Sequence, residues 1–386
     1  MIRCTAAHVD LAALEANYRA LGAYLAAEAA LNRAAGAGPV TPPGIIAVVK
    51  ANAYGHGAVP VARRLEAAGA TWLAVADIEE GMELREAGIR ARILVFGALS
   101  VSDTDGVFTH RLTPTIASPA AARAVAAAAR ARGVRLDCHV KIDTGMHRLG
   151  FRHDNLARTL PEVFADPNLS VEAVDTHFAT AEDAEHPLFE EQRVRFDEAL
   201  RTIEALGARP RLRHAANSAA LLRDSRVWYD LVRPGLLLYG LAPPPLATTM
   251  ALRPVMTLAS RVVAVKGLRP GESVGYGGRF TTDRPATLAV VPAGYADGLD
   301  RRLEGRGAVL VRGRRAPVVG AVSMDMLTAD VSDIPGVSPG DEVVFLGRQG
   351  DEAIQTIDAR EVAAWIGTIP YEILCRLGAR VARRHA

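Results

Sequence analysis

Short apolar runs alternate with amphipathic stretches from Ile45 to Arg233. The stretches between the runs, such as "IEEGMELREAG" and "PLFEEQRVRFDEALRTIEALG", have apolar residues at helical spacing and stop at glycine, as helices often do. Strand and helix that alternate eight times predict a parallel (β/α)8 barrel of the TIM type. The eight expected strands are "IIAVVK", "WLAVAD", "RILVFG", "LTPTIA", "LDCHVKID", "VEAVDTHF", "RLRHAANS" and "YDLVRP".

The pattern changes after three consecutive prolines, Pro243–Pro245. From about Met250 onward, short alternating runs such as "ATLAVVPAGY" and "DEVVFLG" are separated by glycine and proline, which predicts a mostly antiparallel β domain. We therefore expect residues 1–245 to form the barrel domain and residues 246–386 to form a C-terminal β domain. Within the first domain, "HVDLAALEANYRALGAYLAAEAAL" predicts a strand and an Ala-rich helix ahead of the barrel.

Composition indicates an ordinary soluble protein. The chain has 386 residues, a hydrophobic fraction of 49% and a formal net charge of +2, and its arginines are scattered, so we expect no nucleic-acid partner. The first residues lack the apolar core of a signal peptide and no run approaches the length of a bilayer span, so we expect a cytoplasmic protein without membrane contact. Three distant cysteines indicate neither a disulfide framework nor a metal site.

Lysine is rare in this chain. Lys and Arg together number 45, yet lysine stands only at Lys50, Lys141 and Lys266. An amine can lose its proton and add to a carbonyl or to carbon dioxide, which a guanidinium cannot do. Lys50, which ends the first expected strand in "AVVKANAYGHG", is therefore a candidate for covalent chemistry.

Polar residues gather at the predicted carboxyl ends of the barrel strands, where such barrels carry their active sites. The loops "HAANSAA" and "VRPGLLLYG" add a hydroxyl at Ser218 and backbone amides near Gly235 and Leu236, which suits a phosphate group. A lysine and a phosphate site suggest pyridoxal phosphate, although a phosphosugar aldolase would need both as well. The strand-end residues are Lys50, Lys141, Asp143, His177, Asn217, Ser218 and Arg233.

Nine motifs in collinear order resemble those of the alanine racemases, a fold-type III pyridoxal-phosphate family. They are "AVVKANAYGHG", "KIDTGMHRLG", "THFATAED", "HAANSAA", "VRPGLLLYG", "VGYGGRF", "PAGYADGL", "SMDM" and "IPYEILCRL", and they cover nearly the whole chain. The resemblance implies a barrel followed by a β domain, in a homodimer whose active site takes residues from both subunits. It also implies interconversion of L- and D-alanine, which would supply D-alanine for peptidoglycan.

The resemblance implies a role for each matching residue. Lys50 would hold the cofactor and act as one base, and Tyr276 of the partner subunit would be the other, because racemisation exchanges protons on both faces of the α-carbon. Arg148 would bind the substrate carboxylate, with Lys141, carbamylated, positioning it. The further implied residues are Tyr54, His177, Asn217, Ser218, Gly235, Leu236 and Tyr371 at the cofactor, His214 as a partner of Arg233, Met324 and Tyr295 at the substrate, and Asp325 in support.

Arg233 separates the alternatives. In the resembled family an arginine faces the pyridine nitrogen of the cofactor, whereas related decarboxylases are expected to carry a carboxylate there, and "VRPG" has none. Three alternatives remain open: a racemase of another small amino acid such as serine, a decarboxylase of the same fold type, and a non-catalytic pyridoxal-phosphate carrier. The C-terminal domain argues against the carrier, which would be a single barrel.

Overall fold

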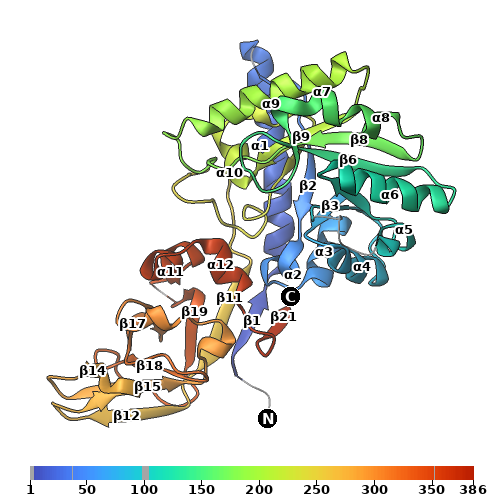
Figure 1. The fold of residues 1–386 in the computed structure, drawn as a ribbon. Helices are drawn as coiled ribbons and strands as arrows, with labels where there is room; N and C mark the ends of the chain where they lie inside the picture. Colours follow the sequence, from blue (N-terminus) through green and yellow to red (C-terminus); the bar gives the residue numbers. More distant parts are fainter. Residues whose placement is uncertain (1–3, 37, 98–103, 352) are drawn as a thin grey trace. The chain divides into compact units, whose positions relative to one another are not determined.

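The computed structural model describes residues 4–36, 38–97, 104–351 and 353–386 (Figure 1). It divides into two compact units. The barrel unit comprises residues 14–53 and 58–252, and the C-terminal unit comprises residues up to 13, residues 54–57 and residues 253–386. Within the described ranges, no helix is long and apolar enough to cross a membrane.

Parallel strands close into a barrel in the first unit. Each strand pairs with the next along the chain, and β10 pairs with β2 to complete the ring. Among the described residues eight strands form this ring, each overlapping a run that the sequence predicted, so the predicted barrel is confirmed. They are β2 (Gly44–Val48), β3 (Trp72–Val75), β4 (Arg92–Val95), β5 (Thr113–Ile116), β6 (Leu136–Asp143), β8 (Leu169–Asp175), β9 (Leu212–Asn217) and β10 (Leu231–Arg233), and β7 (Phe151–Arg152) adds to the edge of β6.

Helices surround these strands, as Figure 1 shows for α3 to α6. Their buried positions recur at helical spacing, for example Val61, Ala62 and Leu65 in α3, because one apolar stripe must leave water. The helices are α1 (Leu11–Ala35), α3 (Ala58–Ala67), α4 (Ile78–Glu86), α5 (Asp105–Thr109), α6 (Pro119–Ala131), α7 (Leu156–Thr159), α8 (Pro161–Ala165), α9 (Leu188–Ala205) and α10 (Ser218–Arg223). A short segment, α2 (Lys50–Tyr54), has an unusual geometry that is described with the site.

The C-terminal unit is built on a mostly antiparallel sheet, as predicted, and its strands β13 and β14 form a separate two-stranded sheet. The N-terminal strand β1 (Ala6–Val9), which the sequence placed ahead of the barrel, belongs to this sheet: it pairs antiparallel with β11 and parallel with β21 (Figure 1). The strands are β11 (Met256–Arg261), β12 (Ala264–Leu268), β13 (Ser273–Val274), β14 (Phe280–Thr281), β15 (Ala286–Val291), β16 (Ala308–Val311), β17 (Arg314–Val319), β18 (Leu327–Asp330), β19 (Glu342–Gln349), β20 (Gln355–Ile357) and β21 (Ala382–His385), and the helices are α11 (Ala359–Ile366) and α12 (Pro370–Cys375).

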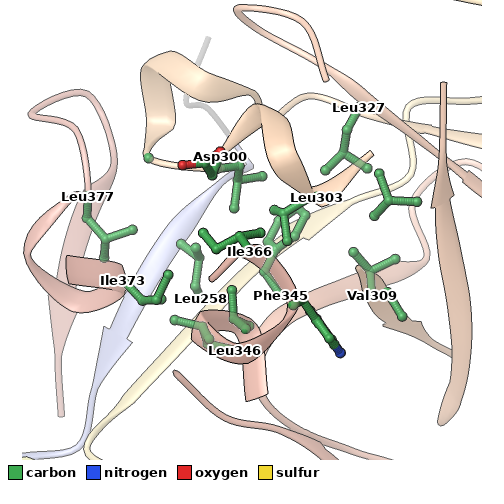
Figure 2. A pocket seen from close by; sticks show the side chains of 16 residues that line it. Leu258, Asp300, Leu303, Val309, Leu327, Phe345, Leu346, Ile366, Ile373 and Leu377 are labelled. Carbon is green, nitrogen blue, oxygen red and sulfur yellow. The ribbon is translucent and has the colours of Figure 1, made fainter. Parts of the chain in front are cut away.

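The core of the C-terminal unit surrounds a small cavity of about 30 Å³ (Figure 2). Leucine, isoleucine and phenylalanine side chains, among them Leu258, Phe345 and Ile366, form most of its lining. Asp300 at its edge is paired with Arg302 and Arg376. An almost entirely apolar lining offers few polar groups to orient a ligand, so the cavity is part of the core that supports the sheet.

Candidate active site

The structure places the predicted strand-end residues at one rim of the barrel, because carboxyl ends of parallel strands in a closed ring face the same side. Lys50 follows β2, Lys141 lies near the end of β6, and His177 lies two residues beyond β8. Ser218 begins α10 directly after β9, and Arg233 is the last residue of β10. Residues far apart in sequence therefore share one site.

Arg233 is buried at the centre of this rim, with 4% of its surface exposed. Its Nη1 donates to His214 Nδ1 at 2.8 Å, and its Nη2 lies 3.1 Å from His177 Nδ1. Nη2 also donates to the carbonyl oxygens of Thr176 (2.8 Å) and Ala215 (2.9 Å). Burial lowers the pKa of the guanidinium and Asp175 opposes this shift, yet arginine stays cationic at neutral pH.

A chain of hydrogen bonds runs from Arg233 into the barrel interior. A guanidinium only donates, so Nδ1 of His214 must accept and its proton must lie on Nε2. That Nε2 lies 2.9 Å from Nδ1 of His139, which must accept in turn. Burial lowers the pKa of His139 to about 4, against opposition from Asp175, and lowers the pKa of His214 well below its usual value. Both rings are therefore neutral, each with its proton on Nε2.

His177 is likewise held neutral. Burial is the main reason that its pKa lies well below the usual value, and the cations Arg233, Lys141, Arg148 and Lys50 add to the shift. All four cations are therefore near enough to the ring to disfavour a further positive charge on it. A neutral imidazole at this position can stack on a planar aromatic group without placing another charge in the site.

Lys141 forms an ion pair with Asp175, the last residue of β8, with Nζ 3.0 Å from Oδ2. Burial lowers the pKa of the Lys141 amine, Asp175 opposes this shift, and Arg233 and Arg148 add to it. The amine thus lies in a secluded place near two arginines, and both the seclusion and these cations lower its pKa.

Ser218 lies where the sequence predicts a phosphate site. Its Oγ accepts a hydrogen bond from the backbone N–H of Gly235 at 2.9 Å, which ties α10 to the loop after β10. The neighbouring Asn217 caps α10, with Oδ1 accepting from Ala220 N at 2.9 Å. Gly235 and Leu236 are buried beside this contact. This hydrogen bond thus joins the segment that follows β9 to the loop that follows β10.

Arg148 lies on a closed loop that leaves β6 and returns to it. The carboxylate of Asp143 accepts hydrogen bonds from the backbone N–H groups of Gly145 and His147, both at 3.0 Å, and Oδ2 lies 3.3 Å from the His147 imidazole. Burial alone would raise the pKa of Asp143, but these N–H groups outweigh it and lower the pKa. A Cβ at Gly150 would come within 2.6 Å of Asp143 N, so the loop can close only with glycine there.

The segment after Lys50 has a left-handed backbone. Ala51, Asn52, Ala53 and Tyr54 have φ between 52° and 53°, and none is glycine. Each such residue is disfavoured by about 1–2 kcal/mol, because its Cβ lies close to the following carbonyl oxygen. Such strain persists only where the surrounding structure holds it.

The remaining predicted residues lie in the C-terminal unit. The rings of Tyr54 and Tyr371 are neighbours, with centroids 6.0 Å apart, and burial raises the pKa of Tyr54. Tyr276, in a single turn after β13, is 76% exposed, and Met324 is 52% exposed. Tyr295 is also exposed, and its backbone N–H donates to Ser323 O at 3.0 Å, which joins the two loops that carry Tyr295 and Met324. Asp325 pairs with Arg380.

Comparison with known proteins identifies the family. The N-terminal domain of alanine racemase matches residues 9–243, and its C-terminal domain matches residues 255–385. The chain belongs to the alanine racemase family. It is 43% identical to the alanine racemase of Symbiobacterium thermophilum over 383 residues, which cover 99% of this chain and 97% of that protein. It is therefore an enzyme, an amino-acid racemase.

Solved alanine racemases share its fold. The alanine racemase from D-cycloserine-producing Streptomyces lavendulae is 37% identical with a TM-score of 0.91, over 100% of this chain and 98% of that chain. The alanine racemase from Bacillus anthracis with bound L-Ala-P is 35% identical with a TM-score of 0.85, over 99% of this chain and 94% of that chain. The family and the fold predicted from the motifs are thus confirmed.

Three residues of this racemase's rim were missed from sequence. His139 and Asp175 make the hydrogen bonds described above, and Glu80 contacts the left-handed segment. His139 lies two residues before Lys141 in β6, so the alternation of a strand places both on one face and could have indicated it. Asp175 and Glu80 gave no such signal, because carboxylates at strand ends and in first turns of helices are common.

Proposed function

We propose that this racemase uses pyridoxal phosphate to interconvert L- and D-alanine. The observation that carries the proposal is Arg233, buried among four acceptors at a rim that also holds Lys50. The residues fit the cofactor: an amine for its aldehyde, a neutral ring at His177, and the Ser218 hydroxyl, fixed by the Gly235 amide, for its phosphate. Asn217, Leu236, Tyr54 and Tyr371 complete the proposed contacts. When bound, pyridoxal phosphate withdraws electrons from the α-carbon and acidifies its hydrogen.

Two residues would move the proton. Lys50 holds the cofactor and exchanges a proton on one face of the α-carbon, and Tyr276 of the partner subunit does so on the other face. The exposure of Tyr276 in a single chain, 76%, supports a role that a second subunit completes. Exposed Tyr295 and Met324 belong to the same unit and support a homodimer with a shared site.

Arg233 would set the electronic character of the site. Because a guanidinium can only donate, Arg233 would keep a pyridine nitrogen that faces it unprotonated and would limit the electron withdrawal by the cofactor. This would favour return of the proton to the substrate over side reactions. His214 and His139 keep Arg233 in place without adding a charge. A decarboxylase is expected to carry a carboxylate here, and the four acceptors around Arg233 would not accommodate one.

The substrate would be held by its carboxylate. Arg148 offers a planar bidentate donor, the Met324 backbone amide a second contact, and Lys141 would act on Arg148 once carbamylated. The secluded, cation-rich position of Lys141 supports this modification. Tyr295 and Tyr371 would narrow the entrance, so that small side chains such as those of alanine and serine enter. In the cytoplasm, D-alanine from this reaction would serve peptidoglycan synthesis.

Reaction in deuterated water tests the function. Purified protein supplied with pyridoxal phosphate is incubated with L-alanine, and the products are separated by chiral chromatography with mass detection. We expect D-alanine with deuterium at the α-carbon, and no product from Lys50→Ala. Unlabelled L-alanine despite bound cofactor would refute the alanine assignment, and release of ethylamine would indicate the decarboxylase.

A further inference from the structure

The left-handed turn of Ala51, Asn52, Ala53 and Tyr54 needs a restraint that holds it. Glycine adopts positive φ freely, whereas L-residues adopt it only under constraint, and this turn contains four in succession. Ala51 and Asn52 are exposed, so burial of their side chains does not hold them. Ala53 and Tyr54 are buried, whereas at Ala51 and Asn52 the restraint must come largely from hydrogen bonds to the backbone and to the Asn52 side chain.

Glu80 in the first turn of α4 provides such a restraint. Its Oε1 accepts a hydrogen bond from Ala51 N at 2.6 Å, and its Oε2 accepts one from Ala76 N at 2.8 Å. One carboxylate therefore joins the first residue of the turn to the residue that follows β3. Glu80 is itself fixed, because its backbone N–H donates to the N-cap residue Asp77 at 2.9 Å.

Other hydrogen bonds support the turn beyond Ala51, two of them at Ala53 and Asn52. Ala53 N donates to Val49 O at 2.8 Å, and Ala58 N donates to the Asn52 side chain at 2.7 Å. Neither fixes the peptide between Lys50 and Ala51. The N–H of that peptide is the one that Glu80 binds, and the plane of this peptide sets the ψ angle of Lys50.

We propose that Glu80 is a positioning residue that holds the left-handed turn and thereby fixes the direction in which the Lys50 side chain leaves the barrel rim. The inference rests on the proposed role of Lys50 in binding the cofactor. Without Glu80 the strained peptide at Ala51 relaxes, and the amine is no longer held where it must react. Glycine at position 51 should make the restraint less necessary, because glycine takes φ +53° without a steric penalty.

The test combines removal of the carboxylate with relief of the strain. Glu80→Ala is expected to lower kcat/KM by about ten- to hundredfold, the range for loss of charge-assisted hydrogen bonds. It should also weaken the binding of pyridoxal phosphate to the apoenzyme, which is measured by the light absorption of the cofactor, and it should speed hydrogen exchange at the Ala51 amide. Ala51→Gly alone should retain activity, and Ala51→Gly combined with Glu80→Ala should recover most of the loss. Glu79→Ala, one residue earlier and exposed, is the matched control and should behave as wild type.

Two outcomes would overturn the proposal: Glu80→Ala indistinguishable from Glu79→Ala in exchange and cofactor binding, or a double variant as impaired as Glu80→Ala. If Glu80→Ala does not fold, Glu80→Gln serves instead, since it keeps one acceptor oxygen and should show a smaller loss that Ala51→Gly also relieves. A wild-type enzyme without racemase activity would refute the proposed function. Hydrogen exchange at Ala51 would still test Glu80 in that case.

Discussion

Replacement of Arg233 by lysine, glutamine and glutamate tests whether its four hydrogen bonds define the site. The four acceptors are the carbonyl oxygens of Thr176 and Ala215 and the Nδ1 atoms of His177 and His214. Nη1 faces one of them and Nη2 faces three, so the two hydrogens of Nη2 are shared among three acceptors. Arginine has five N–H donors, lysine three, glutamine two and a protonated glutamic acid one. The series therefore lowers the number of donors step by step while the four acceptors stay the same.

The expected losses follow from the number of acceptors left unpaired. A buried acceptor without a donor costs about 1–3 kcal/mol, so lysine should lose about 1–3 kcal/mol, glutamine about 2–6 and glutamate about 3–9. Domains are stable by about 5–15 kcal/mol, so the glutamate variant should lie close to the limit of folding. An ionised glutamate would face four lone pairs, so its pKa should be raised.

Denaturant unfolding of the cofactor-free protein measures these losses. The chain has three tryptophans, of which Trp72 and Trp228 are buried in the barrel unit and Trp365 lies in the C-terminal unit. In a Trp365→Phe background, tryptophan fluorescence reports unfolding of the barrel unit alone. Stability should fall in the order arginine, lysine, glutamine, glutamate. A glutamate variant as stable as the lysine variant would refute the donor count, and with it the argument that this site rejects a carboxylate.

Three further predictions concern single residues. Tyr276→Phe should slow α-hydrogen exchange in deuterated water for one enantiomer of alanine more than for the other, and an equal effect on both would contradict the two-base assignment. Asp143→Ala should raise KM for alanine about tenfold with less effect on kcat, because it releases the loop that carries Arg148, whereas Asp143→Asn keeps an acceptor oxygen and should stay within about threefold. Burial alone would raise the pKa of Glu172, but hydrogen bonds from Arg92 and Arg211 outweigh burial and lower this pKa below 4.5. The contribution of Glu172 to folding stability is therefore complete above pH 4.5 and is lost as the pH falls through the lower pKa of the folded state. Glu172→Gln should therefore flatten the acid limb of unfolding measured against pH, and an unchanged limb would contradict this.

The sequence by itself determined the barrel strands and indicated the candidate site residues. Apolar periodicity is a local property of the chain, so runs such as "WLAVAD" predicted β3 without knowledge of its neighbours. Lys50 became a candidate because lysine is rare here and its chemistry differs from that of arginine. Arg233 and His177 became candidates because the carboxyl ends of barrel strands meet at one rim.

Tertiary structure decided what depends on partners distant in sequence. β1 joins the C-terminal unit because its pairing partners, β11 and β21, lie more than 240 residues further along the chain, and no local pattern names them. The proton positions on His139 and His214 follow from Arg233, which can only donate a hydrogen bond. They are therefore fixed only once the closed barrel brings β6, β9 and β10 together. The left-handed backbone after Lys50 contradicts the local preference of its residues. Such a backbone persists only where groups from elsewhere in the chain hold it, and the Glu80 carboxylate contacts it here.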